Sequence, residues 1–149
     1  MASLKQIEDF IASAPVAMAG VSRNPKKFGQ AAFKELKEKG MNIIPINPSA
    51  NEILGVKVYK DVNSLPAEVN GLIIMTKKDQ TAGIVREAKA KGIRNIWIQQ
   101  HSDSKDAIKE LDGSGINYVT GECILMHYKP NSIHKFHRAL SKFFGFFPK

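Results

Sequence analysis

The chain has 149 residues, of which 43% are hydrophobic, a length and composition that fit one globular domain and exclude an intrinsically disordered chain. Its formal net charge of +8 and pI near 9.6 favour anionic partners such as phosphorylated ligands, nucleic acid or an acidic membrane surface. The single cysteine, Cys123, excludes an internal disulfide and predicts a cytoplasmic protein, and no apolar run approaches the roughly 20 residues that span a bilayer.

The N-terminal residues predict a helix followed by the first strand of a sheet. Residues 1–15 carry apolar side chains at helical spacing with charged residues between them, which predicts a short helix covering the sheet edge and argues against a signal peptide. The apolar residues 16–21 predict a strand. Residues 28–39 predict the first core helix, which Gly40 would end as the residue after the C-cap.

Three extended segments come next. Residues 41–46 predict a second strand, with Pro45 near its end because proline cannot donate a ladder hydrogen bond. Residues 56–59 predict a short extended piece at the edge of the sheet. Residues 71–75 are continuously apolar, as expected for a parallel strand that helices cover on both faces.

The remaining residues continue the alternation of helix and strand. Asp79 is a candidate N-cap for a helix that ends at Lys91 and is closed by Gly92. Further along the chain we expect a strand at residues 95–98 and a helix capped by Ser102, Asp103 or Ser104. We then expect a last strand at residues 115–119 and a turn through residues 121–123. A final helix is expected over residues 132–144, within a C-terminal stretch of residues 131–149.

This order of elements predicts one doubly wound, Rossmann-like α/β domain over residues 1–149, with a mostly parallel sheet of about five to six strands. The ligand of such a sheet lies at the carboxyl ends of the strands, at the topological switch point. The expected strand ends are residues 20–23, 47–48, 76–77, 99–100 and 121–123.

The most informative segment is residues 20–29, with the sequence GVSRNPKKFG, between the first strand and the first core helix. A strand, a small-residue turn and a helix start form a phosphate cradle, because backbone N–H groups at the helix start have no partners and the helix dipole favours an anion. The cations in this segment, Arg23, Lys26 and Lys27, indicate a ligand with more negative charge than a single phosphate.

Two common nucleotide-binding motifs are absent from the sequence. A nicotinamide-binding loop has the pattern G-x-G-x-x-G, and Asp or Glu follows at the end of the second strand. Here Ser22 replaces the second glycine. Asn47 and Pro48 occupy the end of the second strand, and no carboxylate occurs there before Glu52. A Walker-type Gly-Lys-Ser/Thr sequence does not occur either.

Four ordered motifs resemble those of the small CoA-binding domain proteins, whose fold is similar to the N-terminal domain of the succinyl-CoA synthetase α subunit. Residues 20–29 resemble the G-A-S-x-x-P-x-K-x-G loop of that family, with Val21 in place of the common alanine. Residues 46–48 match its V-N-P, residues 97–99 its W-x-Q, and residues 121–126 its terminal G-x-C-I-M.

The resemblance implies coenzyme A, or an acyl-CoA, as the ligand, since its pyrophosphate and 3′-phosphate match the positive charge of the loop. It also implies the cofactor-binding residues. These are Gly20 and Ser22 at the pyrophosphate, Arg23, Lys26 and Lys77 at the phosphates, Asn47 and Pro48 beside the adenosine half, Thr76 and Gln99 along the groove, and Val21 and Gly29 within the loop.

Ligase chemistry does not follow from the resemblance, because in the synthetases the phosphorylated histidine and the nucleotide-hydrolysing parts lie outside this domain. We therefore expect a CoA-binding protein with no catalytic residues of its own, which acts with a protein partner or as a homodimer. The alternative is an NAD(P)-dependent oxidoreductase that uses the same loop. A specific nucleic-acid-binding module, favoured only by the net charge, lacks aromatic stacking residues among its lysines.

Two further groups of residues are interpreted as structural. Cys123 follows the last expected strand, and a buried structural thiol is preferred over a nucleophile activated by His127. The spacing of Cys123, His127, His134 and His137 matches no familiar zinc pattern, so no metal site is expected. The basic and aromatic residues 134–149 are interpreted as a helix packing on the sheet or a dimer contact, not as a membrane-binding surface.

Overall fold

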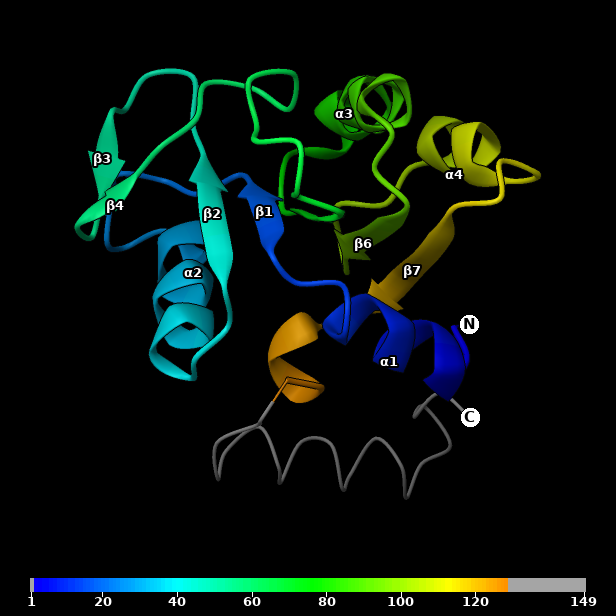
Figure 1. Ribbon diagram of the computed structural model, residues 1–149, viewed down its shortest axis with the longest axis horizontal. Helices are drawn as coiled ribbons and strands as arrows, with labels where there is room; N and C mark the ends of the chain where they lie inside the picture. The colour runs from blue at the N-terminus through cyan, green and yellow to red at the C-terminus, as the bar shows by residue number, and fades with distance from the viewer. Residues whose placement is uncertain (1, 129–149) are drawn as a thin grey trace.

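The computed structural model describes residues 2–128, which fold around a five-stranded sheet in the order β2–β1–β5–β6–β7 (Figure 1). Every neighbouring pair in this sheet is parallel. The predicted doubly wound, Rossmann-like α/β fold is therefore confirmed. The strands are β1 (Val16–Ala19), β2 (Ile43–Ile46), β5 (Gly71–Ile74), β6 (Asn95–Gln99) and β7 (Asn117–Glu122).

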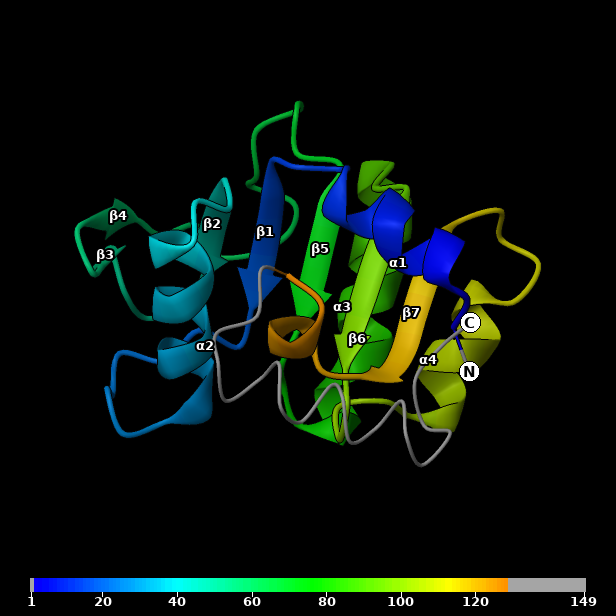
Figure 2. The same cartoon turned by 90° about the horizontal axis from the view of Figure 1, so that it is seen from below.

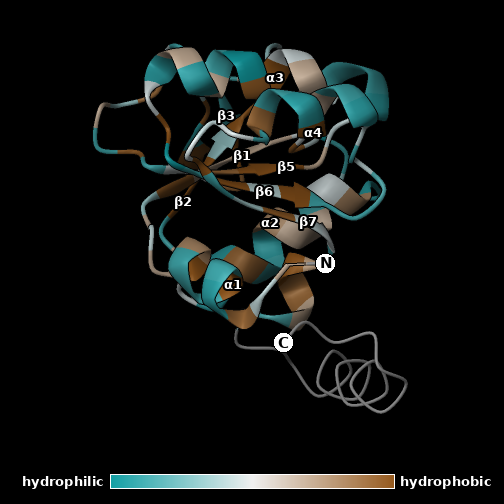
Figure 3. Ribbon diagram, turned by 90° about the vertical axis from the view of Figure 1, so that its right-hand side faces the viewer, coloured by the Kyte–Doolittle hydropathy of each residue, from teal (hydrophilic) through white to brown (hydrophobic). Residues whose placement is uncertain are grey.

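Helices cover both faces of the sheet, as Figures 2 and 3 show. α1 (Leu4–Ile11) and α2 (Phe28–Glu38) lie on one face, and α3 (Lys78–Lys91) and α4 (Lys105–Leu111) lie on the other. Because both faces are covered, β1 and β5 are buried at every residue, which explains their continuously apolar sequences. None of the described helices has the length and apolar character needed to cross a membrane.

The N-terminal helix is capped at its start and anchored near its end. Ser3 and Gln6 form a capping box, in which the side chain of each accepts from the backbone N–H of the other. Phe10 is fully buried, and its ring meets Trp97 edge-on with the ring centroids 5.5 Å apart. α1 therefore packs on β6 and β7, at the edge of the sheet where the sequence pattern placed it.

The helices α3 and α4 are joined at the surface by one carboxylate. Glu110 of α4 accepts hydrogen bonds from Lys89 and Arg86 of α3. These hydrogen bonds hold the pKa of Glu110 below its usual range, and the bond from Lys89 has the larger effect. Such an exposed pair adds little stability, so the apolar faces of both helices provide most of their attachment to the sheet.

A small hairpin extends the β2 edge of the sheet. It consists of β3 (Glu52–Ile53) and β4 (Val56–Lys57), which pair in antiparallel fashion; only the second was anticipated as an extended piece. Tyr59 follows it and bridges Ile46 at the end of β2. Pro45 lies in β2, which is an edge strand of the five-stranded sheet. Proline is tolerated there because the N–H that it lacks is not needed to pair two central strands.

The strands β1, β2 and β4 are each two residues shorter than expected, and two other boundaries differ in kind. Lys77 is the N-cap of α3, and Asp79 lies within the first turn of that helix. β7 continues through Gly121 to its end at Glu122, where a turn was expected, and the left-handed φ of 74° at Gly121 accompanies a register shift against β6. Ser104 is the cap of α4, one of the expected candidates, and the helix expected over residues 132–144 lies outside the described residues.

Replacing Phe10 with alanine tests the anchoring of α1. The substitution leaves a cavity beside Trp97, and we expect it to lower the free energy of unfolding by about 3–5 kcal/mol. Chemical denaturation followed by the fluorescence of Trp97, the only tryptophan of the chain, measures this loss. The matched control is Leu4→Ala on the same helix, where the side chain is 38% exposed. Equal losses in the two variants would contradict the anchoring role.

Candidate functional site

The centre of the sheet contains the topological switch point. β1 and β5 are neighbours, but the chain leaves β1 towards α2 on one face and leaves β5 towards α3 on the other. The two connections therefore diverge and leave a crevice at the carboxyl ends of these strands. This is where doubly wound sheets bind their ligands.

Two glycines allow the loop after β1 to pack closely on other backbone segments. A Cβ added to Gly20, whose φ is 94°, would lie 2.3 Å from the carbonyl oxygen of Met75, directly after β5. A Cβ added to Gly29, in the first turn of α2, would lie 2.1 Å from the carbonyl oxygen of Gly20. Side chains cannot approach backbone so closely, so this path requires glycine at both positions.

Side-chain hydrogen bonds fix the same loop from two sides. The Asn47 Nδ2 at the end of β2 donates to the carbonyl oxygen of Val21 at 2.8 Å, and Gln30 Nε2 in α2 donates to that of Ser22 at 3.0 Å. The Ser22 hydroxyl oxygen accepts from the backbone N–H of Asn24 at 3.0 Å, which leaves the hydroxyl proton for another acceptor. The loop is thus shaped before any ligand binds.

The two helices that start at the crevice lack side-chain caps. Lys27 is the N-cap of α2 and Lys77 is the N-cap of α3, and neither side chain accepts a hydrogen bond from the first turn. By contrast, Ser3 caps α1 and Ser104 caps α4. At the crevice, uncapped N–H groups, two positive helix-dipole ends and two cationic N-cap residues all favour an anion.

The other cations of the loop are also accessible. Arg23, Lys26 and Lys27 are exposed. None of the three forms an ion pair with another residue in the range 2–128. A phosphate in the crevice would therefore meet no competing carboxylate at these groups.

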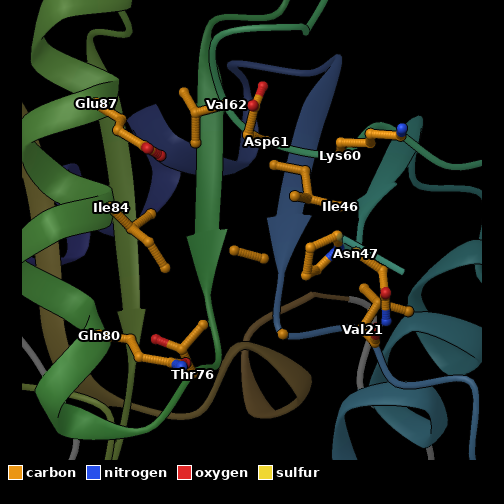
Figure 4. Close-up of a pocket in the computed structure, with 13 residues that line it drawn as sticks. Val21, Ile46, Asn47, Lys60, Asp61, Val62, Thr76, Gln80, Ile84 and Glu87 are labelled. Atoms are coloured by element: carbon orange, nitrogen blue, oxygen red, sulfur yellow. Dashed lines mark hydrogen bonds between the residues drawn. The ribbon is translucent and has the colours of Figure 1, made fainter. Parts of the chain in front are cut away.

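A pocket of about 340 Å³ extends from the loop along α3 (Figure 4). Gly20, Val21 and Thr76 lie at the end nearest the loop, beside Asn47 and Pro48 from the end of β2. Gln80, in the first turn of α3, lies beside Thr76 at this end. The walls farther along α3 are formed by the apolar side chains of Ile46, Val62 and Ile84 and the charged side chains of Lys60, Asp61 and Glu87. We call this the α3 pocket.

A second pocket, of about 470 Å³, lies over the ends of β5 and β6, and we call it the β6 pocket. Thr76, just after β5, lines both this pocket and the α3 pocket, so the two cavities adjoin at this residue. Phe28, which is 55% exposed, forms one wall. His101, with a φ of 75°, and Gln99 form part of the opposite side.

The polar atoms of Gln99 are engaged behind this pocket. Gln99 Nε2 donates to the Sγ of Cys123 at 3.0 Å, and Gln99 Oε1 accepts from the backbone N–H of Ile124 at 3.0 Å. Cys123 is buried, in agreement with the structural role expected for it. His127 Nε2 lies 3.1 Å from a carboxylate oxygen of Glu122.

The predicted site residues gather at this edge of the sheet. The α3 pocket is lined by Gly20, Val21, Asn47, Pro48 and Thr76, and the β6 pocket by Thr76, Lys77 and Gln99. The other four lie in the loop that connects β1 to α2 and in the first turn of α2. Ser22, Arg23 and Lys26 belong to the loop, and Gly29 belongs to the first turn of α2, where it contacts Gly20.

Sequence reasoning missed the wall of the α3 pocket that α3 provides. Gln80, Ile84 and Glu87 recur at i, i+4 and i+7, so they share one face of the helix. That spacing was visible in the sequence, but a helix face that packs on a sheet shows the same spacing, and Ile84 does pack against the core as well as lining the pocket. The segment with Asp61 and Val62 carried no motif, because its place in the site depends on how the long connection after β4 folds back.

Alanine substitutions at two glycines test the close packing of the loop. We expect Gly29→Ala to lower the free energy of unfolding by more than about 1 kcal/mol, because its Cβ would collide with the carbonyl of Gly20. Gly83→Ala, inside α3, is the control: its Cβ would meet nothing within 4 Å, and we expect a gain of about 0.5–1 kcal/mol. Urea denaturation measures both, and a Gly29→Ala variant as stable as the wild type would contradict this packing.

The burial of Cys123 predicts a slow thiol. We expect a soluble disulfide reagent to react with it at least about tenfold more slowly in the folded protein than in denaturant, because the sulfur is covered and accepts from Gln99. The single cysteine makes the measurement unambiguous. Equal rates in the folded and denatured states would show an accessible thiol instead.

Comparison with known proteins identifies relatives with named activities. A family model described as a CoA binding domain matches residues 15–129. The acetate–CoA ligase [ADP-forming] II subunit alpha of Pyrococcus furiosus is 38% identical over 84 residues, which are 56% of this chain and only 18% of that subunit. An uncharacterized protein of Bacillus subtilis, YneT, is 25% identical over 109 residues, which are 73% of this chain and 81% of that protein.

Solved structures show the same architecture. A conserved hypothetical protein from Pyrococcus furiosus is similar with a TM-score of 0.71 and 32% identity, over 74% of this chain and 95% of that one. A hypothetical protein from Pyrococcus horikoshii OT3 has a TM-score of 0.76 at 24% identity, over 87% of this chain and 95% of its own, and shows the shared fold. Since the family model matches most of the residues, from just before β1 to beyond η1 (Ile124–Met126), this chain belongs to the CoA-binding domain family.

Proposed function

We propose that this chain binds coenzyme A, or an acyl-CoA, in the crevice between the ends of β1 and β5. The observation that carries the proposal is the convergence of two uncapped helix starts, each with a lysine at its N-cap, on the loop of residues 20–29. The pyrophosphate and 3′-phosphate of CoA supply the negative charge that such a site favours. Membership of the CoA-binding domain family supports the same ligand.

The phosphates are proposed to bind at the loop. Gly20 permits close approach of the pyrophosphate to the backbone, and the Ser22 hydroxyl has a proton to donate. Arg23, Lys26 and Lys77 are exposed around this point and provide charge-assisted hydrogen bonds. The free N–H groups at the start of α2 complete the set of donors.

The two pockets are proposed to take the two ends of the ligand. The adenosine half enters the α3 pocket beside Asn47 and Pro48. The pantetheine arm passes Thr76, which both cavities share, and continues into the β6 pocket near Gln99. One extended ligand with a charged middle and two neutral ends fits this arrangement better than a compact phosphate.

The alternative is an NAD(P)-dependent oxidoreductase with its nucleotide in the same crevice. In that class an acidic residue at the end of the second strand holds the ribose hydroxyls. Here the end of β2 presents Asn47, whose side chain is bonded to the loop, and Pro48. The family match and this strand end both favour CoA.

The proposal is for binding without self-contained catalysis. The relative named as an acetate–CoA ligase subunit includes the matched region as 18% of its length. We propose that this chain presents CoA to a protein partner or to a second copy of itself, which would supply any group-transfer chemistry. The exposed crevice at the strand ends leaves the bound thiol within reach of such a partner.

Titration calorimetry with CoA, dephospho-CoA, acetyl-CoA and NAD⁺ tests the proposal. We expect saturable binding of CoA that Arg23→Ala weakens about tenfold or more, because a hydrogen bond to a charged group contributes about 1.5–3 kcal/mol. The matched control is Lys34→Ala, which removes an exposed cation one to two turns along α2 from the loop and should leave affinity nearly unchanged.

The ligand series separates the two candidate functions. Weaker binding of dephospho-CoA than of CoA would support recognition of the 3′-phosphate, and similar binding of acetyl-CoA would show that the site tolerates an acyl group. Tight binding of NAD⁺ without any response to CoA would overturn the proposal in favour of the oxidoreductase.

A further inference from the structure

The α3 pocket is polarised along its length. The cations of the loop and of the α3 start lie at one end, near Gly20 and Thr76. The other end is lined by two carboxylates, Asp61 and Glu87, and by Lys60, which lies beside Asp61 (Figure 4). This end of the pocket therefore offers carboxylate acceptors away from the proposed phosphate position.

The two carboxylates differ in their bonding. Asp61 accepts a hydrogen bond from the backbone N–H of Ser64 at 2.9 Å, which stabilises the turn that contains it. Glu87 is exposed, and its carboxylate forms no ion pair and accepts no hydrogen bond within residues 2–128. Lys91, the natural i+4 partner of Glu87, instead donates to the carbonyl oxygen of Asn63 at 3.0 Å.

The position of Glu87 matches the length of a nucleoside. Gln80 lies in the first turn of α3 near the proposed phosphate position, and Glu87 lies seven residues farther, about 10 Å along the helix axis. This span is comparable to that from the 5′ oxygen to the exocyclic amino group of adenosine. Between them, Ile84 faces Ile46 and Val62 across the pocket, as apolar walls for a planar base (Figure 4).

We propose that Glu87 accepts a hydrogen bond from the exocyclic amino group of adenine and makes the site selective for adenine over 6-oxo purines; this rests on the proposed binding of CoA. An adenine amino group donates two hydrogens and suits a carboxylate. A hypoxanthine base presents an acceptor oxygen at the same position, which the carboxylate repels. The carboxylate thus makes a base-specific contact at the end of the ligand that carries no charge.

Binding of CoA and of its deaminated analogue, in which hypoxanthine replaces adenine, tests this selectivity by calorimetry. The two ligands have identical phosphates and pantetheine, so their affinity ratio isolates the base. We expect the wild type to prefer CoA on the order of tenfold, as for one charge-assisted hydrogen bond. In Glu87→Ala the ratio should fall close to one, and in Glu87→Lys, which turns the acceptor into a donor, it should invert.

Glu8→Ala is the matched control, because it removes an exposed carboxylate from α1 on the other face of the sheet. It should retain the wild-type ratio, and circular dichroism should show that every variant is folded. An unchanged ratio in Glu87→Ala would overturn the role of Glu87 while leaving CoA binding intact. A wild type that binds neither ligand would overturn the proposed function itself.

Discussion

The contact between three backbone segments at the centre of the sheet determines the geometry of everything around it. The chain at residue 20 lies against the end of β5, and the start of α2 lies against the chain at residue 20. Neither contact leaves room for a side chain, and hydrogen bonds from Asn47 and Gln30 to the loop carbonyls hold the same segment. The uncapped start of α2 is therefore held at the crevice.

Charged side chains are distributed unevenly around that loop and along the α3 pocket. Cations surround the crevice, where phosphates would lie, and two carboxylates together with Lys60 line the opposite end of the α3 pocket, where a neutral base would lie. The net charge alone would favour any polyanion. The carboxylates at the far end of the pocket are the basis of the proposed preference for a ligand that carries a hydrogen-bond donor there.

Most of the fold was predictable because continuous apolar runs and helical spacing are local properties of the chain. The strands at the centre of the sheet were recognisable from their runs of consecutive apolar residues, which are typical of a parallel sheet covered by helices on both faces. The strand β3 was not recognisable from the sequence, because a strand of two residues shows no periodicity. The N-cap of α3 was misplaced, because Asp79 is a typical N-cap residue although the helix begins after Lys77. The loop of the candidate site was predictable from its glycines and cations. The α3 wall was not, since an inward-facing Ile84 looks the same whether it faces a core or a pocket.

The two edges of the sheet limit how this protein can associate with other chains. At one edge, β2 contains Pro45 and is partly covered by the β3–β4 hairpin and Tyr59. At the other edge, β7 is interrupted by the register shift near Gly121. A proline and a bulge at sheet edges disfavour strand addition, which is a common route to aggregation and to continuous intermolecular sheets. An association through helices and loops, in place of these edges, would keep the sheet of each chain separate.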